Sequence, residues 1–224
     1  MVYALKKASM KVKDPLSGLT HFLAIILAII GMAVLIYKSS SPVKPWHIVT
    51  FSIYGAGMIF LYGASTLYHW LPLSEKGTHY LRKLDHMMIF VLIAATYTPF
   101  CLIPMRGPWG WSLFGLIWAL ALLGIFFKLF WIEVPRWLTA LLYVGMGWMA
   151  LIGIVPLVKA IEFGALAWVL VGGILYSLGA IIYAIKKPDP WPSIFGFHEI
   201  FHVFVVFGSG AYFWVMLKYI LPMQ

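Results

Sequence analysis

Long apolar stretches, each about the length of a membrane-spanning helix, dominate this 224-residue sequence. A helix needs about 20 mostly apolar residues to cross the hydrocarbon core of a bilayer. Hydrophobic residues make up 63% of the chain and charged residues only 10%, so a soluble fold would lack the polar surface to cover itself. The pattern predicts an all-α integral membrane protein, a seven-transmembrane helix bundle. The expected spans are residues 17–37, 47–70, 84–103, 110–130, 137–158, 165–185 and 198–220.

Short polar segments rich in Pro and Gly separate these spans, and no water-soluble domain fits between them. We therefore expect a single transmembrane domain over residues 17–220. A short basic segment, residues 1–16, precedes it on the cytoplasmic side, and an outer tail, residues 221–224, follows it. The first span is too long for the apolar core of a secretory signal, and no small-residue cleavage site follows it, so we expect it to be retained.

The basic residues are distributed unequally between the two sides of this topology. Of the 16 Lys and Arg residues, 11 fall on the N-terminal side and 5 on the other. Cytoplasmic loops carry such an excess, which predicts a cytoplasmic N-terminus and an outer C-terminus in the cell membrane, the inner membrane in a bacterium. This orientation argues against a G-protein-coupled receptor. The net charge of +9 suits an anionic leaflet, and no motif for binding nucleic acid is present.

Polar and ionisable residues gather at the predicted cytoplasmic ends of the first, second, third and seventh spans. Ionisable side chains within a membrane are costly and commonly functional, so this cluster is the candidate site. By contrast, His47 and His79 sit in loops, where we expect them to be solvated. The clustered residues are Asp14, Ser17, His21, Ser65, His69, Asp85, His86, His198, Glu199 and His202.

A histidine pair in the seventh span has the spacing of two metal ligands. His198 and His202 are four residues apart, so a helix places both imidazoles on one face. A third histidine from another helix would complete the protein ligands of a catalytic zinc site, and His69 is the best candidate. Asp85 could then act as a base for the metal's water or orient a ligand. Ser65, one turn before His69, could hydrogen-bond that water or the imidazole.

Other interpretations of these residues stay open. The string from His198 to His202 also reads H-E-x-x-H, the motif of zinc metalloproteases, in which the Glu is the general base. Asp14 could simply cap the first span. His86 points about 100° away from Asp85 on a helix, which favours an interfacial role over metal binding. The sequence leaves open the roles of Asp14, Ser17, His21, His86 and Glu199.

Three motifs spread over nearly the whole chain resemble the hemolysin III family, the bacterial branch of the progestin and adipoQ receptor superfamily. Residues 95–99, Ala-Thr-Tyr-Thr-Pro, resemble a further stretch of that family. Asp14 stands where the family usually has Glu, and Ser17 where it has Asn. The motifs are E-x-x-N-x-x-T-H, matched by Asp14, Ser17, Thr20 and His21; S-x-x-x-H with an Asp opening the next span, matched by Ser65, His69 and Asp85; and H-x-x-x-H, matched by His198 and His202.

This resemblance implies seven spans with a cytoplasmic N-terminus and, as in the receptor members, a zinc ion held by three histidines near the cytoplasmic face. The matching positions are His69, His198 and His202. The family's Asp at position 85 contacts the zinc-bound water, and its Ser at position 65 lies beside it. The related alkaline ceramidases suggest hydrolysis of a lipid amide, whereas the family name suggests haemolysis. About 16 residues precede the first span, too few for a domain that binds a protein hormone.

Two hypotheses of function follow. In the first, the protein is a zinc-dependent hydrolase of lipid amides that draws its substrate from the inner leaflet. Zinc would lower the pKa of a bound water to about 7, and Asp85 would take the proton. In the second, the protein is not an enzyme but forms pores or senses membrane fluidity, with a structural zinc joining the second and seventh spans. Membrane lipids are the expected partners in both cases.

Overall fold

The computed structural model describes residues 12–192 and 194–224, and within these ranges its regular structure is helical. This confirms the predicted fold class. Six helices are each long and apolar enough to cross a membrane. A bent pair, α5 and α6, makes a seventh candidate if it counts as one span. The helices are α1 (Pro15–Ser39), α2 (Pro45–Trp70), α3 (Glu75–Leu102), α4 (Pro108–Phe130), α5 (Arg136–Gly147), α6 (Ile154–Ala160), α7 (Phe163–Ile185) and α8 (Phe197–Val215).

Local sequence explains where several helices begin. Proline occupies the first turn of α1, α2 and α4, where its missing N–H costs no hydrogen bond. The α3 helix begins at Glu75, well before its apolar stretch, because the Ser74 side chain accepts a hydrogen bond from the Gly77 amide at 3.3 Å. This capping residue allows the helix to begin with polar turns that precede the apolar part of the span.

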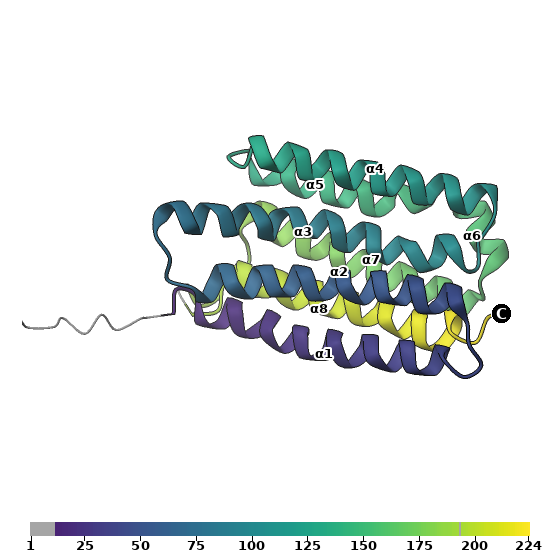
Figure 1. Cartoon of the computed structure of the whole chain (residues 1–224). Helices are drawn as coiled ribbons and strands as arrows, with labels where there is room; N and C mark the ends of the chain where they lie inside the picture. The colour runs from purple at the N-terminus through teal and green to yellow at the C-terminus, as the bar shows by residue number, and fades with distance from the viewer. Residues whose placement is uncertain (1–11, 193) are drawn as a thin grey trace, which may run out of the picture.

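The helices form a central group with two helices at its edge (Figure 1). The α2 helix packs between α1 and α3, while α8 packs against α7 and α1. The α4 helix lies on α3, and α5 lies mainly on α7. Contact between α2 and α3 is close: a Cβ atom added at Gly57 would meet the Ala95 side chain at 2.5 Å. Small residues allow such approach in membrane helices, where van der Waals packing holds the bundle together.

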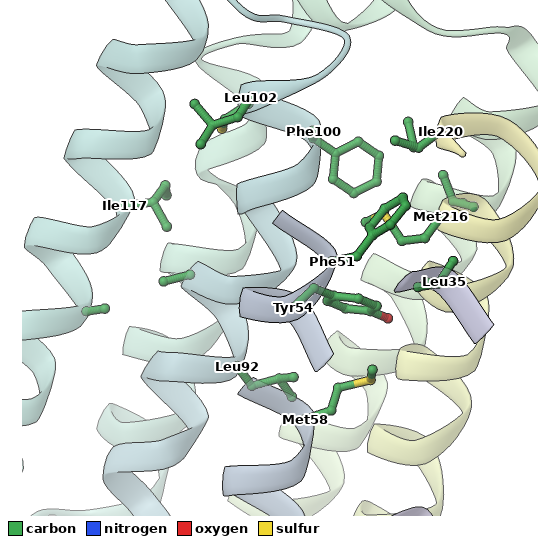
Figure 2. Close-up of a cluster of buried hydrophobic side chains, with 14 of the residues drawn as sticks. Leu35, Phe51, Tyr54, Met58, Leu92, Phe100, Leu102, Ile117, Met216 and Ile220 are labelled. Atoms are coloured by element: carbon green, nitrogen blue, oxygen red, sulfur yellow. The ribbon is translucent and has the colours of Figure 1, made fainter. Parts of the chain in front are cut away.

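A cluster of buried apolar side chains fills the bundle toward the end where α1 finishes and α2 begins (Figure 2). Leu35 of α1 and Phe51 of α2 lie there, with Met216 and Ile220 from the π-helical turn (Met216–Ile220) that extends α8. All four are fully buried. This packing holds the ends of α1, α2 and α8 together.

The fifth predicted span is interrupted. A 3₁₀ turn (Trp148–Leu151) follows α5, and the axis bends by 59° before α6. The Tyr97 hydroxyl of α3 supports the break: it accepts a hydrogen bond from the Ala150 amide at 2.8 Å and donates one to the Gly147 carbonyl. Backbone groups freed at membrane depth need such partners. Residues of this broken span line a cavity together with residues of α3, α7 and α8.

Candidate metal centre

Three histidines from two helices converge at one end of the bundle. His69 lies in the last turn of α2, and His198 and His202 lie in the first two turns of α8. The nitrogens that they could offer to one ion lie within 4.8 Å of one another. The Nε2 atoms of His69 and His198 are 3.2 Å apart. The i, i+4 spacing and the predicted third histidine thus come together in space.

The chemistry of these side chains fits a metal ion. His69 donates from Nδ1 to the Asp14 carboxylate at 3.0 Å, and His202 donates from Nδ1 to the Ser17 carbonyl at 3.2 Å. In both rings the Nε2 lone pair is then left for a ligand bond, the usual arrangement in metal sites. Two nitrogens bound to one tetrahedral zinc at about 2.0–2.1 Å lie roughly 3.3 Å apart, close to the His69–His198 separation.

Residues at the start of α1 contact two of these histidines. The sequence had left the roles of these residues open. Asp14 is the N-cap residue of α1, but its side chain makes no capping hydrogen bond. Its carboxylate accepts a hydrogen bond from His69 instead, and that hydrogen bond lowers the pKa of Asp14. The Asp14 amide also donates to the His69 carbonyl at 2.9 Å. Thr20 Oγ1 lies 3.2 Å from His202 Nδ1. Of the two departures from the family motif, the Asp14 side chain contacts His69, whereas the Ser17 side chain contacts Glu199 and only its backbone carbonyl contacts a histidine, His202.

Glu199 lies between the two histidines in sequence but is engaged elsewhere. Its Oε1 accepts a hydrogen bond from the Ser17 hydroxyl, and its Oε2 accepts one from the Gly196 amide at 2.8 Å. With both oxygens occupied, the carboxylate ties the start of α8 to α1. This argues against the general-base role that an H-E-x-x-H protease would require.

Asp85 and Ser65 lie beside the histidines. Both are buried, and Asp85 lies close to His69. Ser65 lies close to Asp85, yet its hydroxyl has no hydrogen bond of ordinary geometry among the described residues. His86 is not part of the three-histidine group; its Nδ1 donates to the Arg82 carbonyl of its own helix at 2.8 Å.

A cavity of about 350 Å³ extends from this cluster into the bundle. Its walls come largely from α3, α7, α8 and the broken fifth span, and most of its lining is apolar. Since one water molecule takes about 30 Å³, the cavity is large enough for a chain of several methylene groups. The lining includes Asp85, His198 and His202, together with apolar residues such as Ile89, Leu157 and Val205.

Two further histidines, His47 and His79, were expected to lie in loops and to be solvated. His79 is exposed on α3, as expected for solvation. For His47 the expectation was wrong: it is only 2% exposed and donates from Nε2 to the Ile220 carbonyl at 3.0 Å. Its place in the first turn of α2 brings it against the free carbonyls at the end of the last helix.

Comparison with known proteins identifies the family. Residues 10–213 match the family model described as Haemolysin-III related. The chain belongs to the hemolysin III family. It is 39% identical over 208 residues to "Hemolysin-3" of Bacillus cereus, covering 92% of this chain and 91% of that protein. It is 38% identical over 203 residues to "Hemolysin-3 homolog" of Bacillus subtilis, covering 91% and 92%.

The similarity reaches receptor proteins as well. An "Adiponectin receptor protein" of Drosophila melanogaster is 26% identical over 216 residues, which cover 87% of this chain but 48% of the receptor. These matches confirm the resemblance drawn from the motifs. Together with the candidate spans, they identify a multi-span membrane protein of the hemolysin III family, consistent with the plasma membrane.

Proposed function

We propose that this hemolysin III family protein binds zinc and hydrolyses lipid amides at the cytoplasmic side of the membrane. The observation that carries the proposal is the meeting of three histidines and a buried carboxylate at the end of an apolar cavity. Ligand-type side chains in a mostly apolar pocket are the usual form of a small-molecule site. The orientation follows from the Lys and Arg distribution.

His69, His198 and His202 would hold the zinc ion, and Asp14 would orient His69 through its hydrogen bond. A zinc ion with three protein ligands supplies Lewis acidity: it polarises a carbonyl group and activates water at neutral pH. Asp85 would accept the proton of the attacking water, since it is the buried carboxylate beside the histidines. The free hydroxyl of Ser65 would position that water.

The cavity would hold the acyl chain of the substrate. Its lining of Ile89, Leu157, Val205 and similar residues offers the contacts that an alkyl chain needs and keeps bulk water from the reacting carbonyl. With the N-terminus in the cytoplasm, the amide would lie near the level of the inner-leaflet headgroups. The fold thus favours a lipid substrate over a soluble one.

Substitution of Asp85 by Asn tests this assignment. The purified, zinc-loaded variant should retain its metal and lose at least 100-fold of its activity toward a long-chain N-acyl amine, because a positioned base contributes about 10²–10⁴. Glu133→Gln is the control, since Glu133 is an exposed carboxylate paired with Arg82. Equal activity of Asp85→Asn and wild type, or no hydrolysis by zinc-loaded wild type, would refute the proposal.

The name of the Bacillus cereus relative, "Hemolysin-3", favours a second candidate, a protein that perturbs membranes without hydrolysis. Zinc would then join α2 and α8 as a structural element. Release of a dye from vesicles containing the protein separates the two candidates. If Asp85→Asn releases dye as fast as wild type and neither hydrolyses lipid amides, the second candidate holds. If Asp85→Asn loses both dye release and lipid-amide hydrolysis, the result supports the enzyme.

A further inference from the structure

Four large apolar side chains of the cavity wall are also exposed on the outside of the bundle. Between 38% and 56% of each is accessible, whereas the other large apolar side chains of the lining are buried or half-buried. All four lie on consecutive segments of the chain: the end of the 3₁₀ turn, α6 and the first half of α7. They are Leu151, Ile154, Val158 and Leu170. Along these segments the wall of the cavity is therefore also the outer surface of the protein.

The packing of the broken span changes along its length. Its first part, α5, packs against α7. After the 59° bend, α6 makes no extensive contact with α7 or α8 within the described residues, although only two residues separate α6 from α7 in the chain. The four exposed wall residues flank this boundary, with Leu170 on α7 and the other three on the side of α6. Both observations indicate a side opening of the cavity between α6 and α7.

The side opening lies far from the histidines and within the hydrocarbon layer. Tyr183 of α7 lies beside His198, with ring centroids 6.1 Å apart, and Leu170 precedes Tyr183 by thirteen residues on the same helix. At 1.5 Å per residue the opening is about 20 Å along the helix axis from the histidines. The hydrocarbon core is about 30 Å thick, so the opening faces lipid tails and not water.

The neighbouring space inside the bundle is too small to take the end of a long chain. A second cavity adjoins the first at the level of the bend, and Leu157, Val169 and Tyr212 line both. Its volume is about 40 Å³, against about 350 Å³ for the main cavity, so it can hold only a short piece of a chain. A chain that fills the main cavity therefore continues through the side opening.

We propose that the side opening lets the acyl chain of a bound lipid leave the protein and continue among the surrounding lipid tails. The cavity then holds only the part of the chain next to the histidines and sets no upper limit on chain length. An extended chain advances about 1.2 Å per bond, so a chain longer than roughly 16 carbons reaches the opening. The inference rests on the proposed function in taking the occupant to be a lipid amide, and hydrolysis is not required for it.

Binding of lipids that differ only at the far end of the chain tests this inference. N-acylethanolamines compete with a fluorescent long-chain lipid for zinc-loaded protein in nanodiscs, with correction for partition into empty nanodiscs. Wild type should bind chains of 16, 20 and 24 carbons within about threefold. A pyrenyl group at the end of a 12-carbon chain falls inside the cavity and should weaken binding at least about tenfold, because overpacking is unfavourable. On a 20-carbon chain the same group lies outside and should cost less than about threefold.

Bulky side chains at the side opening should create a chain-length limit. Val158→Trp combined with Leu170→Trp adds an indole ring on each side, so binding of the 24-carbon chain should fall at least about tenfold, while binding of the 12-carbon chain stays within about twofold. Val155→Trp combined with Val171→Trp is the matched control, since both residues are exposed on the same helices but do not line the cavity. Equal binding of the 24-carbon chain by the two double variants would overturn the proposal.

Wild type alone provides a second test in case the double variant does not fold. A loss of at least about tenfold between 16 and 24 carbons, or an equal loss from the pyrenyl group on both chains, also overturns the proposal. Mass spectrometry of the same samples follows hydrolysis independently. Binding that tolerates long chains, without hydrolysis, would refute the proposed function and leave this inference standing. Hydrolysis restricted to chains of up to about 16 carbons would do the reverse, and absence of binding by every chain would overturn both.

Discussion

The two ends of the bundle differ in how completely their buried polar groups are paired. At the end where α2 begins, His47 is paired with the Ile220 carbonyl, and the Lys44 amine donates to the carbonyls of Leu221 and Met223 at 2.9 and 2.7 Å. At the end where α2 finishes, both nitrogens of His21 and the hydroxyl of Ser65 lack partners among the described residues. Buried polar groups are normally paired, so the second end departs from the rule that the first obeys.

The contrast indicates that one end of the bundle mainly stabilises the fold, whereas the other end carries the candidate site. The paired end joins α1, α2 and α8 through packing and hydrogen bonds, and it needs nothing from outside. The histidine end contains buried polar atoms without partners among the described residues, and a cavity adjoins it. Functional sites commonly sacrifice some stability in this way.

Removing one histidine at each end should give two variants with the largest difference in zinc content. Purified His198→Ala should contain close to no bound zinc, because two imidazoles alone do not complete the site. His47→Ala should contain as much zinc as wild type, since its ring bonds a carbonyl in the other half of the bundle. Elemental analysis by mass spectrometry measures both. Zinc at the wild-type level in His198→Ala would refute the site.

Chelation should destabilise the protein through the histidine end only. Metal at about 1,000 times its Kd stabilises a folded protein by about 4 kcal/mol, so removing it should lower the thermal stability measured by size exclusion after heating in detergent. The stability of His198→Ala should not respond to the chelator. An equal response of this variant would show that the chelator acts at another place.

Substitution of Asp14 by Asn should weaken metal binding without abolishing it. The Asp14 carboxylate accepts the hydrogen bond from His69, and loss of such a partner typically costs 10- to 100-fold in metal affinity. Competition with a zinc indicator measures the change. Ser39→Ala, at the other end of α1, is the control, since its hydroxyl bonds only the Leu35 carbonyl. Unchanged affinity in Asp14→Asn would remove Asp14 from the site.

Substitution of Lys44 by Ala should give the smallest effect and should spare the metal. It removes the hydrogen bonds to the carbonyls that follow α8, which should cost about 1 kcal/mol of stability. Zinc affinity should remain that of wild type. Lys38→Ala is the control, because Lys38 is exposed at the same end of the bundle. Reduced zinc affinity in Lys44→Ala would mean that the two ends are coupled.

The parts of the structure that depend on a local sequence pattern could be predicted. Apolar length locates the helices, and the i, i+4 spacing together with equal depth brings His69, His198 and His202 to one place. The contacts of α1 with His69 and Glu199 were not predicted, because they join spans that hydropathy treats as independent. The bend in the fifth span was missed for a similar reason, since average hydropathy does not register a break in helix axis.

Buried polar groups show the same limit. The assignment of His47 to a loop suggested a solvated side chain, yet the carbonyl of Ile220, more than a hundred residues away, pairs with the imidazole and allows it to be buried. Lys128 is likewise fully buried, with its amine bonded to Thr139 Oγ1 at 2.8 Å. Whether a polar residue faces water or a partner depends on tertiary contacts, which a single sequence does not state.

The separation of the three histidines along the chain has a consequence for biosynthesis. His69 and His198 are 129 positions apart, so α2 enters the membrane long before α8 is made. A ribosome translating this message must release the last helix before the three imidazoles can meet. If the three imidazoles bind zinc as proposed, they can do so only after α8 has been made, so a chain truncated before residue 198 should bind no zinc at this site.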